Sequence, residues 1–384
     1  MNDSVLSRYL KSYIMVALLC ICGFSSAHAS YSWSDFSKAP NVAVLDMDSN
    51  TLLFERNVDE IVAPASISKL MLLYITFQHL KAGALKMNDM FIVSDNAATS
   101  GEPVAFLKAG DKVTVRELIS AAIVASGNDA CITIAEGLYG SEKDFVKEMN
   151  NVAAKMGLKN SNFVNVTGWP NLNSMSTRDI MTLSVRIFRD FPEYYGFFGE
   201  KTFSYNGKTR MNYNTLLNYN IRVDGLKTGH HTGQGYGMAA SAEKDGRRIF
   251  VVVNGLITEA ERAYEVKRLV LHALNHFETK SLFKSGTTVG YIEKVGKKNS
   301  LPVYVRNDVV VVYRKGAARK IRMFISHKNP VVPPIEKDQK VGDLIVDVGE
   351  DAEYRFPVYA LEAVSARCRI CSIVRSFFKS APSN

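Results

Sequence analysis

Cysteine is scarce in this sequence, and its placement excludes a disulfide framework. Of the five cysteines in 384 residues, Cys20 and Cys22 lie in an N-terminal apolar run, which leaves Cys131, Cys368 and Cys371. An odd trio does not form a paired set. The last two form a C-x-x-C, but no second pair or neighbouring histidine completes a zinc set, and no preceding strand indicates a thioredoxin unit. The sequence therefore predicts no metal site, no cofactor and no redox role.

The sequence also lacks apolar runs long enough to span a membrane, although a shorter apolar run lies near the N-terminus. Arg8 and Lys11 precede the run YIMVALLCICGF, and the small residues Ala27 and Ala29 follow it. That run is too short to cross a bilayer comfortably, and the A-x-A pattern predicts cleavage after Ala29. We interpret residues 1–29 as a signal peptide for export across the inner membrane to the periplasm. A retained N-terminal anchor is the alternative.

The formal charge of +9 comes without any run of basic residues interleaved with aromatics. Such a run would be expected of a nucleic-acid-binding protein, and an exported protein seldom meets nucleic acid. The charge therefore favours anionic lipid or a cell-wall polymer as the neighbour of this chain.

The length and the pattern of strands and helices predict two domains. Residues 30–282 begin and end with predicted strands and carry helices between them, which indicates an α+β domain with an antiparallel sheet covered by helices. Residues 283–357 contain short alternating runs between turn clusters, which is typical of a smaller all-β domain. After Pro357 the chain is predicted to turn helical again, over residues 358–384.

Local signals place several elements of the larger domain. Turn dipeptides predict hairpins at Asn206-Gly207 and Asp245-Gly246. Capping pairs predict helix starts at Thr114 with Glu117 and at Thr258 with Glu261.

The C-terminal segment has an amphipathic pattern. Apolar residues recur at steps of three and four, at Ile370, Ile373, Val374, Phe377 and Phe378, and basic and small polar residues occupy the opposite face. The segment is too short and too charged to span a bilayer, but a basic helix with phenylalanines suits a membrane surface. A terminal helix packed on its own protein is the alternative.

The stretch PASISKLMLLYI, residues 64–75, places Ser66 three residues before Lys69 where a helical pattern begins. Residues three apart share a face of a helix, so the amine can take the hydroxyl proton if burial or a nearby positive charge lowers its pKa. Alternatively, Ser66 only caps the helix. The same spacing recurs at Ser241, Ser281 and Ser376. It therefore does not decide between the two interpretations by itself.

Two further motifs follow in order along the chain. The triplet SGN at 126–128 lies in a predicted turn between helices, and KTG at 227–229 lies on a predicted strand. S-x-x-K, S-x-N and K-T-G in this order are the constellation of serine acyl-transfer enzymes related to penicillin-binding proteins and class A β-lactamases. A KSG triplet at Lys284 lacks the strand context. The order of the three motifs favours the nucleophile interpretation of the serine.

The motif residues can be given roles as a hypothesis. Ser66 attacks an amide carbonyl, Lys69 takes its proton, and Ser126 relays a proton to the leaving amine. Asn128 orients Lys69 or the substrate amide, and the charge of Lys227 holds Lys69 neutral.

The remaining candidates bind the substrate. Backbone N–H groups of Ser66 and His230 form an oxyanion hole. Gly229 lets the strand edge approach the substrate closely, and Lys227 with Thr228 offers a positive charge and a hydroxyl to a terminal carboxylate. Taken singly, each residue also has an ordinary interpretation as a turn, cap or surface residue.

With these motifs, the chain resembles the D-alanyl-D-alanine carboxypeptidases, the low-molecular-mass penicillin-binding proteins of the penicillin-binding protein 5 type. The resemblance runs from APNVAVLDMDSNTLLFERNVDEIVAPASISKLM through SGNDACITIAE, MGLKNSNFVNVTGW and STRDI to the β-rich tail. It implies that the serine domain cuts the terminal D-alanine from peptidoglycan pentapeptide and that β-lactams acylate the same serine. It also implies that the carboxylate-contacting arginine of the family falls on Arg262. The loop GHHTGQGYG departs from the family and implies different contacts at the substrate rim.

Three rival functions remain open. A β-lactamase shares the motifs but needs a carboxylate to activate the deacylating water, and residues 161–180 contain no glutamate, only Asp179. A murein endopeptidase on the same scaffold is the second, although the extra β domain and terminal helix suit a carboxypeptidase better. The third is a non-catalytic cell-wall-binding protein, which the intact motif residues disfavour.

Overall fold

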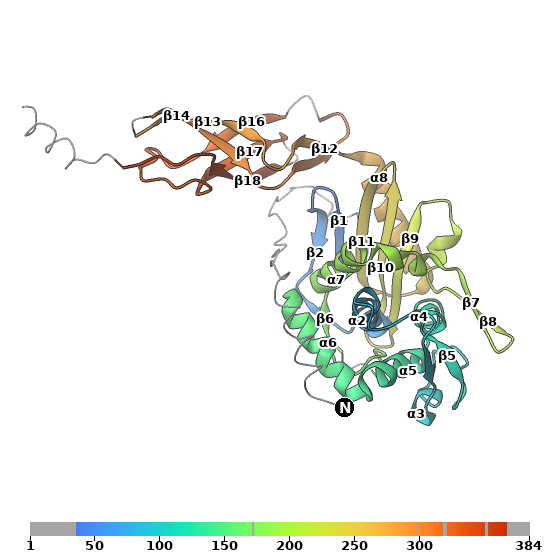
Figure 1. Ribbon diagram of the computed structural model, residues 1–384. Coiled ribbons are helices and arrows are strands. Elements are labelled where there is room, and N and C mark those ends of the chain that lie inside the picture. The colour runs from blue at the N-terminus through green and yellow to red at the C-terminus, as the bar shows by residue number, and fades with distance from the viewer. Residues whose placement is uncertain (1–35, 171–172, 297, 318–320, 350–351, 367–384) are drawn as a thin grey trace, which may run out of the picture.

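Figure 1 shows the computed structural model, which describes residues 36–366 apart from 171–172, 297, 318–320 and 350–351. The predicted signal peptide, the C-x-x-C at Cys368 and Cys371, and the amphipathic segment from Ile370 onward lie outside the described residues. No helix within the described residues combines the length and apolar character needed to cross a membrane.

The larger part of the molecule is built on an antiparallel sheet with the strand order β2-β1-β11-β10-β9. Its strands are β1 (Asn41–Asp46), β2 (Thr51–Arg56), β9 (Val223–His231), β10 (Gly235–Lys244) and β11 (Arg247–Leu256). The predicted turn at Asp245-Gly246 joins β10 to β11 and is confirmed. Strand β9, which carries the K-T-G triplet, is the last strand on one side of the sheet as described.

Helices cover both faces of this sheet (Figure 1). Because side chains alternate along a strand, Leu45 and Val252 pack into the same cluster as the buried residues of α2, whereas Val44 and Val253 pack with those of α8. The helices are α2 (Lys69–Lys81), α3 (Asp95–Ala98), α4 (Val115–Val124), α5 (Asn128–Tyr139), α6 (Glu142–Met156), α7 (Thr177–Asp190) and α8 (Glu259–His276). The expected α+β class is confirmed.

Helix α2 lies at the centre of this part of the protein. All nine residues from Lys69 to Phe77 are buried. A helix that is apolar around its whole circumference packs inside a protein rather than on its surface, and α2 is surrounded by α5, α6 and α7. The first residue of this central helix is therefore held in a fixed position.

Short elements surround the core and match the local sequence signals. The capping box of Thr114 and Glu117 forms in both directions at the start of α4, and Thr258 caps α8 through the N–H of Glu261. Hairpin β7-β8 turns at Asn206-Gly207 as expected. The short elements are β3 (Ile61–Val62), η2 (Ala65–Ser68), β4 (Met90–Ile92), β5 (Lys112–Thr114), β6 (Met175–Ser176), η3 (Pro192–Gly199), β7 (Thr202–Tyr205), β8 (Lys208–Met211) and η4 (Thr215–Asn218).

The C-terminal part consists of strands, as expected. One sheet has the order β13-β14-β18-β17-β16, and β12 pairs with β15. The strands are β12 (Phe277–Phe283), β13 (Thr288–Val295), β14 (Lys298–Val305), β15 (Val309–Arg314), β16 (Arg322–Ser326), β17 (Lys340–Asp347) and β18 (Glu353–Ala360). Strand β12 follows α8 directly, so the strands of this part begin earlier than the boundary expected at 282.

The predicted return to helix after Pro357 is wrong for the residues that the structure describes up to 366. Strand β18 continues through Pro357 to Ala360, and Val364 then pairs with Ile335. Proline lacks an N–H and is read as a strand terminator. Here Pro357 pairs with β17 alone, because the ladder to β14 begins only at Val358. The strand therefore tolerates the proline.

Candidate active site

Ser66 lies in the single turn η2, between Pro64 and helix α2. Side chains three residues apart eclipse in a 3-10 helix, and the Lys69 Nζ lies 2.8 Å from the Ser66 Oγ. The helix-cap interpretation is wrong, because the cap positions are occupied by Pro64 and Ser68. The preceding Ala65 has a φ of 48°, in the left-handed region that costs energy for residues with a Cβ. Strain is thus stored next to the hydroxyl.

Lys69 is fully buried and surrounded by oxygen atoms. Its Nζ lies 2.8 Å from Ser66 Oγ and 2.9 Å from Asn128 Oδ1. It also lies 2.6 Å from the backbone carbonyl oxygen of Thr167. Burial lowers the pKa of Lys69 from 10.5 to about 8, and coulombic interactions with Cys131 and Asp129 oppose this shift. The amine is therefore suited to act as a base near neutral pH.

Lys227, on β9, is 1% exposed and donates from Nζ to the carbonyl oxygen of Thr228 at 3.3 Å. Burial and, next, the charge of Lys69 lower the pKa of Lys227 well below its usual value, and Arg262 adds to this. The expectation that Lys227 holds Lys69 neutral needs correction, because burial is the largest cause of the Lys69 shift. Desolvation outweighs charge repulsion where both amines are removed from water.

Ser126 and Asn128 lie where the chain passes from α4 to α5, as the sequence predicts. Asn128 donates from Nδ2 to the carbonyl oxygens of Gly101 at 3.1 Å and Glu102 at 3.3 Å, which turns its Oδ1 toward Lys69. The Ser126 hydroxyl is buried and has no hydrogen-bond partner among the residues that the structure describes. A buried hydroxyl without a partner is costly, so it is available to a bound substrate.

Gly229 lies where β9 passes over the nucleophile turn. A Cβ at this position would lie 2.5 Å from the carbonyl oxygen of Pro64 and 3.0 Å from Ile67. The expected reason for this glycine was a close approach of substrate. The structure shows a close approach of the protein's own backbone. The adjoining Thr228 is 5% exposed on the same strand.

Arg262 lies in the first turn of α8, close to the end of β9. Its Nη2 donates to Glu259 Oε1 at 2.7 Å and to the carbonyl oxygen of Tyr213 at 3.2 Å. The guanidinium lies 5.7 Å from the ring of Tyr236, which in turn stacks on His230 at 4.0 Å. Its Nε is buried without a partner among the described residues. Arg262 thus has a donor left for a ligand anion.

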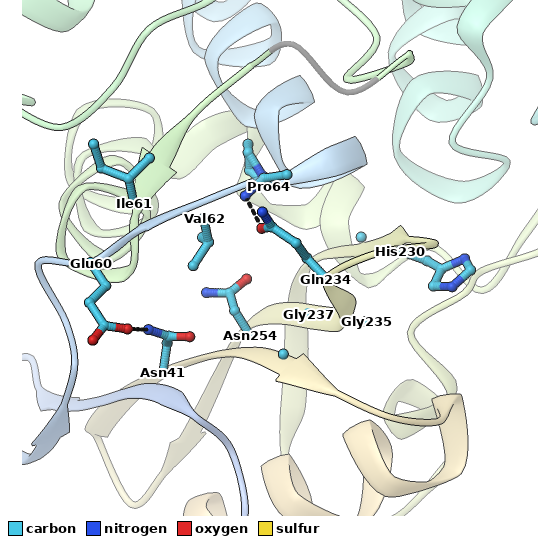
Figure 2. Close-up of a pocket in the computed structure, with 13 residues that line it drawn as sticks. Asn41, Glu60, Ile61, Val62, Pro64, His230, Gln234, Gly235, Gly237 and Asn254 are labelled. Atoms are coloured by element: carbon cyan, nitrogen blue, oxygen red, sulfur yellow. Dashed lines mark hydrogen bonds between the residues drawn. The ribbon is translucent and has the colours of Figure 1, made fainter.

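Figure 2 shows a cavity of about 250 Å³ beside the nucleophile turn, with Pro64, Gly229 and His230 in its wall. Its polar side chains are Asn41, Glu60, His230, Gln234 and Asn254. Gln234 Oε1 accepts from the backbone N–H of Ala63 at 2.5 Å. The GHHTGQGYG loop therefore folds back onto the segment that leads into η2, and this polar cavity lies beside it.

The segment from 161 to 180 contributes a carbonyl rather than a carboxylate to the lysine. Asp179 accepts from the backbone N–H of Asn160 and the hydroxyl of Ser161, each at 2.8 Å, so its oxygens hold the loop. The Thr167 carbonyl, which contacts Lys69, was not expected, because any residue carries a carbonyl and the sequence gives no signal for it. Among the described residues, no three His, Cys, Asp or Glu side chains gather as metal ligands would.

Comparisons with known proteins match most of the chain to D-alanyl-D-alanine carboxypeptidases. A family model described as D-alanyl-D-alanine carboxypeptidase matches residues 30–257, and one described as penicillin-binding protein 5, C-terminal domain, matches residues 277–366. D-alanyl-D-alanine carboxypeptidase DacC of Escherichia coli is 34% identical over 358 residues, which cover 89% of each chain. DacF of Bacillus subtilis is 30% identical and covers 92% of this chain and 94% of that protein. The structure of penicillin binding protein 5 from Haemophilus influenzae has a TM-score of 0.77 at 30% identity, covering 85% of this chain and 97% of that one.

Proposed function

We propose roles for these residues in a chain that belongs to the D-alanyl-D-alanine carboxypeptidase family. The protein is a serine hydrolase of the penicillin-binding protein type that removes the terminal D-alanine from peptidoglycan pentapeptide. One observation supports the catalytic roles above the others. The Lys69 amine is fully buried, has a pKa of about 8, and lies 2.8 Å from the Ser66 hydroxyl.

In the proposed acylation, neutral Lys69 takes the Ser66 proton while Oγ attacks the carbonyl between the last two D-alanines. The oxyanion accepts hydrogen bonds from the backbone N–H groups of Ser66 and His230, each worth about a hundredfold or more in rate. The C–N bond then breaks as Ser126 gives its hydroxyl proton to the leaving amine and takes the proton that Lys69 holds, so Lys69 is neutral again. Water attacks the resulting ester and Lys69 takes the water's proton. The bond to Ser66 Oγ breaks, Lys69 returns the proton to Oγ, and the shortened peptide leaves as a carboxylic acid.

The proposed site for the terminal carboxylate of the substrate lies between β9 and α8. Arg262 has an unpartnered buried Nε within the described residues, and Thr228 offers a hydroxyl. Hydrogen bonds between a guanidinium and a carboxylate are stronger than those between neutral groups. Lys227 adds positive charge when it is protonated. These groups would favour a peptide that ends in a free carboxylate.

Labelling with a fluorescent penicillin tests the nucleophile. The wild type should form a covalent adduct, and Ser66→Ala should not, because β-lactams acylate the serine that attacks the peptide. Ser241→Ala is a matched control, since Ser241 also precedes a lysine by three residues but lies on β10. Labelling that survives in Ser66→Ala would refute the assignment.

Release of free D-alanine from a pentapeptide, measured beside β-lactam turnover and cleavage of cross-linked stems, separates the rival enzymes. We expect D-alanine release and a long-lived β-lactam adduct, because the only carboxylate of the 161–180 segment is committed to Asn160 and Ser161. Fast β-lactam turnover would favour a β-lactamase, and cleavage of cross-links an endopeptidase. Absence of any serine-dependent product would favour a non-catalytic cell-wall-binding protein.

We further propose a periplasmic location at the outer face of the cytoplasmic membrane. The supporting patterns are the N-terminal signal with cleavage after Ala29 and the basic amphipathic segment that carries Phe377 and Phe378. Replacing both phenylalanines by serine in the full-length chain should move the protein from the membrane to the soluble fraction. Replacing Ser372 and Ser376 by alanine, on the opposite face, should not. Equal fractionation of both variants would contradict the proposal.

A further inference from the structure

The hydrogen bonds around Lys69 determine where its lone pair points. A neutral amine has two N–H groups and one lone pair. The Thr167 carbonyl oxygen, at 2.6 Å, and Asn128 Oδ1, at 2.9 Å, can only accept hydrogen bonds. Only the Ser66 hydroxyl, at 2.8 Å, can donate. If both N–H groups are engaged by the two acceptors, the lone pair faces Ser66, as proton transfer requires.

The Thr167 carbonyl is held in place by Asn165. Asn165 Oδ1 accepts from the backbone N–H of Thr167 at 3.2 Å and of Gly168 at 2.6 Å. Gly168 has a φ of 80°, and a Cβ there would lie 2.1 Å from the carbonyl oxygen of Ala65. The loop is therefore pressed against the residue that precedes the nucleophile.

Asn173 joins this loop to the nucleophile turn through one buried amide. It is 3% exposed. Its Nδ2 donates to Ser68 Oγ and to the Asn165 carbonyl oxygen, both at 3.0 Å. Its Oδ1 accepts from the backbone N–H of Val164 at 2.8 Å and of Asn165 at 3.1 Å. Ser68 Oγ in turn donates to the Ala65 carbonyl oxygen at 2.8 Å.

We infer that Asn173 is a positioning residue for the acylation step: by tying Asn165 to η2, it holds the Thr167 carbonyl on Lys69 and aims the amine's lone pair at Ser66. This inference rests on the proposed function, because it assigns a base role to Lys69. Asn173 touches no reacting atom and acts through the backbone that it holds.

The charges around Lys69 allow this role to be measured. The titratable side chains that act on the pKa of Lys69 are Asp129 and Cys131 of α5, and Lys69 in turn lowers the pKa of Lys227 on β9. The loop from 162 to 174 carries no titratable side chain. Glu142 of α6 accepts from the backbone N–H of Val166 at 3.0 Å. A neutral substitution at Asn173 therefore changes hydrogen-bond geometry at the amine without removing a charge.

The test is the rate of acylation by a fluorescent penicillin between pH 6 and 10, for wild type and Asn173→Ala. We expect the high-pH plateau to fall about tenfold, because a misdirected base loses part of its usual contribution. We also expect the acidic limb to move to lower pH by roughly half a unit or more, because the ammonium form loses an acceptor. A change in stability alone would lower the active fraction without moving the limb.

Asn150→Ala is the matched control. Asn150 holds the same loop from α6, donating to the Phe163 carbonyl oxygen at 2.7 Å and accepting from its N–H at 2.9 Å. It makes no hydrogen bond to η2. The acidic limb of the Asn150→Ala acylation profile should stay at the wild-type pH. An unmoved limb in Asn173→Ala, or an equal shift in Asn150→Ala, overturns the inference.

Ser68→Ala serves if Asn173→Ala does not fold, because it removes only the hydroxyl that receives the Asn173 amide. The same changes in the same direction, but smaller, are expected, and a wild-type profile would overturn the inference. A wild type that is not labelled at Ser66 would instead refute the proposed function. The two failures are therefore distinguishable.

Discussion

Raising the pH from 7 to 9 should accelerate acylation of Ser66 about tenfold in the wild-type protein. With a Lys69 pKa of about 8, the neutral amine makes up about a tenth of the molecules at pH 7, half at pH 8 and nine-tenths at pH 9. Only the neutral amine can take the hydroxyl proton. The acylation rate should therefore follow this fraction and level off above pH 9.

Burial of the lysine provides most of this reactivity. An amine with the usual pKa of 10.5 would be neutral in about three of ten thousand molecules at pH 7. The lowered pKa raises the neutral fraction at that pH about three hundredfold. The cause is desolvation, because Lys69 has no exposed area.

Stopped-flow acylation by a fluorescent penicillin measures this profile. The non-enzymatic opening of the penicillin at high pH is subtracted with Ser66→Ala, which has the same fold without the nucleophile. A rate that stays flat from pH 6 to 9, or that rises only above pH 10, would refute the argument that burial prepares the base.

Three further predictions follow from the same contacts. Lys69→Met should abolish labelling yet raise the free energy of unfolding at pH 7 by up to about 3 kcal/mol, as checked by urea titration. A lysine whose pKa is lower in the folded chain reduces the free energy of unfolding below pH 8, and this cost falls as the pH rises toward 10.5. The stabilisation by Lys69→Met should therefore shrink between pH 8 and 10.5. A variant less stable than the wild type at pH 7 would contradict the prediction. Arg262→Ala should lower kcat/KM for D-alanine release about 10- to 100-fold, because a charged hydrogen bond is lost, and an effect no larger than that of Glu259→Ala would contradict a carboxylate contact. Gly229→Ala should lower stability by about 1–3 kcal/mol in urea unfolding, because its Cβ meets the Pro64 carbonyl oxygen at 2.5 Å. Gly196→Ala, which has nothing within 4 Å, should lower it much less.

The sequence predicted the parts of the site that depend on side-chain identity and spacing. Ser66 and Lys69 meet because a helical turn brings residues three apart together, and Asn128 reaches them from the start of another helix. The sheet and its hairpins followed from alternating apolar residues and turn dipeptides. Such signals are local, so they can be read without knowing the tertiary structure.

What the sequence could not predict depends on backbone and burial. The Thr167 carbonyl carries no residue signature, and the link from Asn173 to Ser68 joins positions 105 residues apart. Which lysine lowers the pKa of the other depends on how deeply each amine is buried, and residue spacing does not give that burial. The strand through Pro357 needs the pairing partner on each side.

Helix α2 has a practical consequence for work with this protein. Its first residue is Lys69, and the core encloses it on all sides, so the hydroxyl–amine pair cannot loosen unless the whole core opens. Heat or urea should then abolish penicillin labelling of Ser66 and the near-ultraviolet circular dichroism signal at the same midpoint. The intensity of the fluorescent penicillin band on a gel would therefore measure the fraction of natively folded molecules in a preparation.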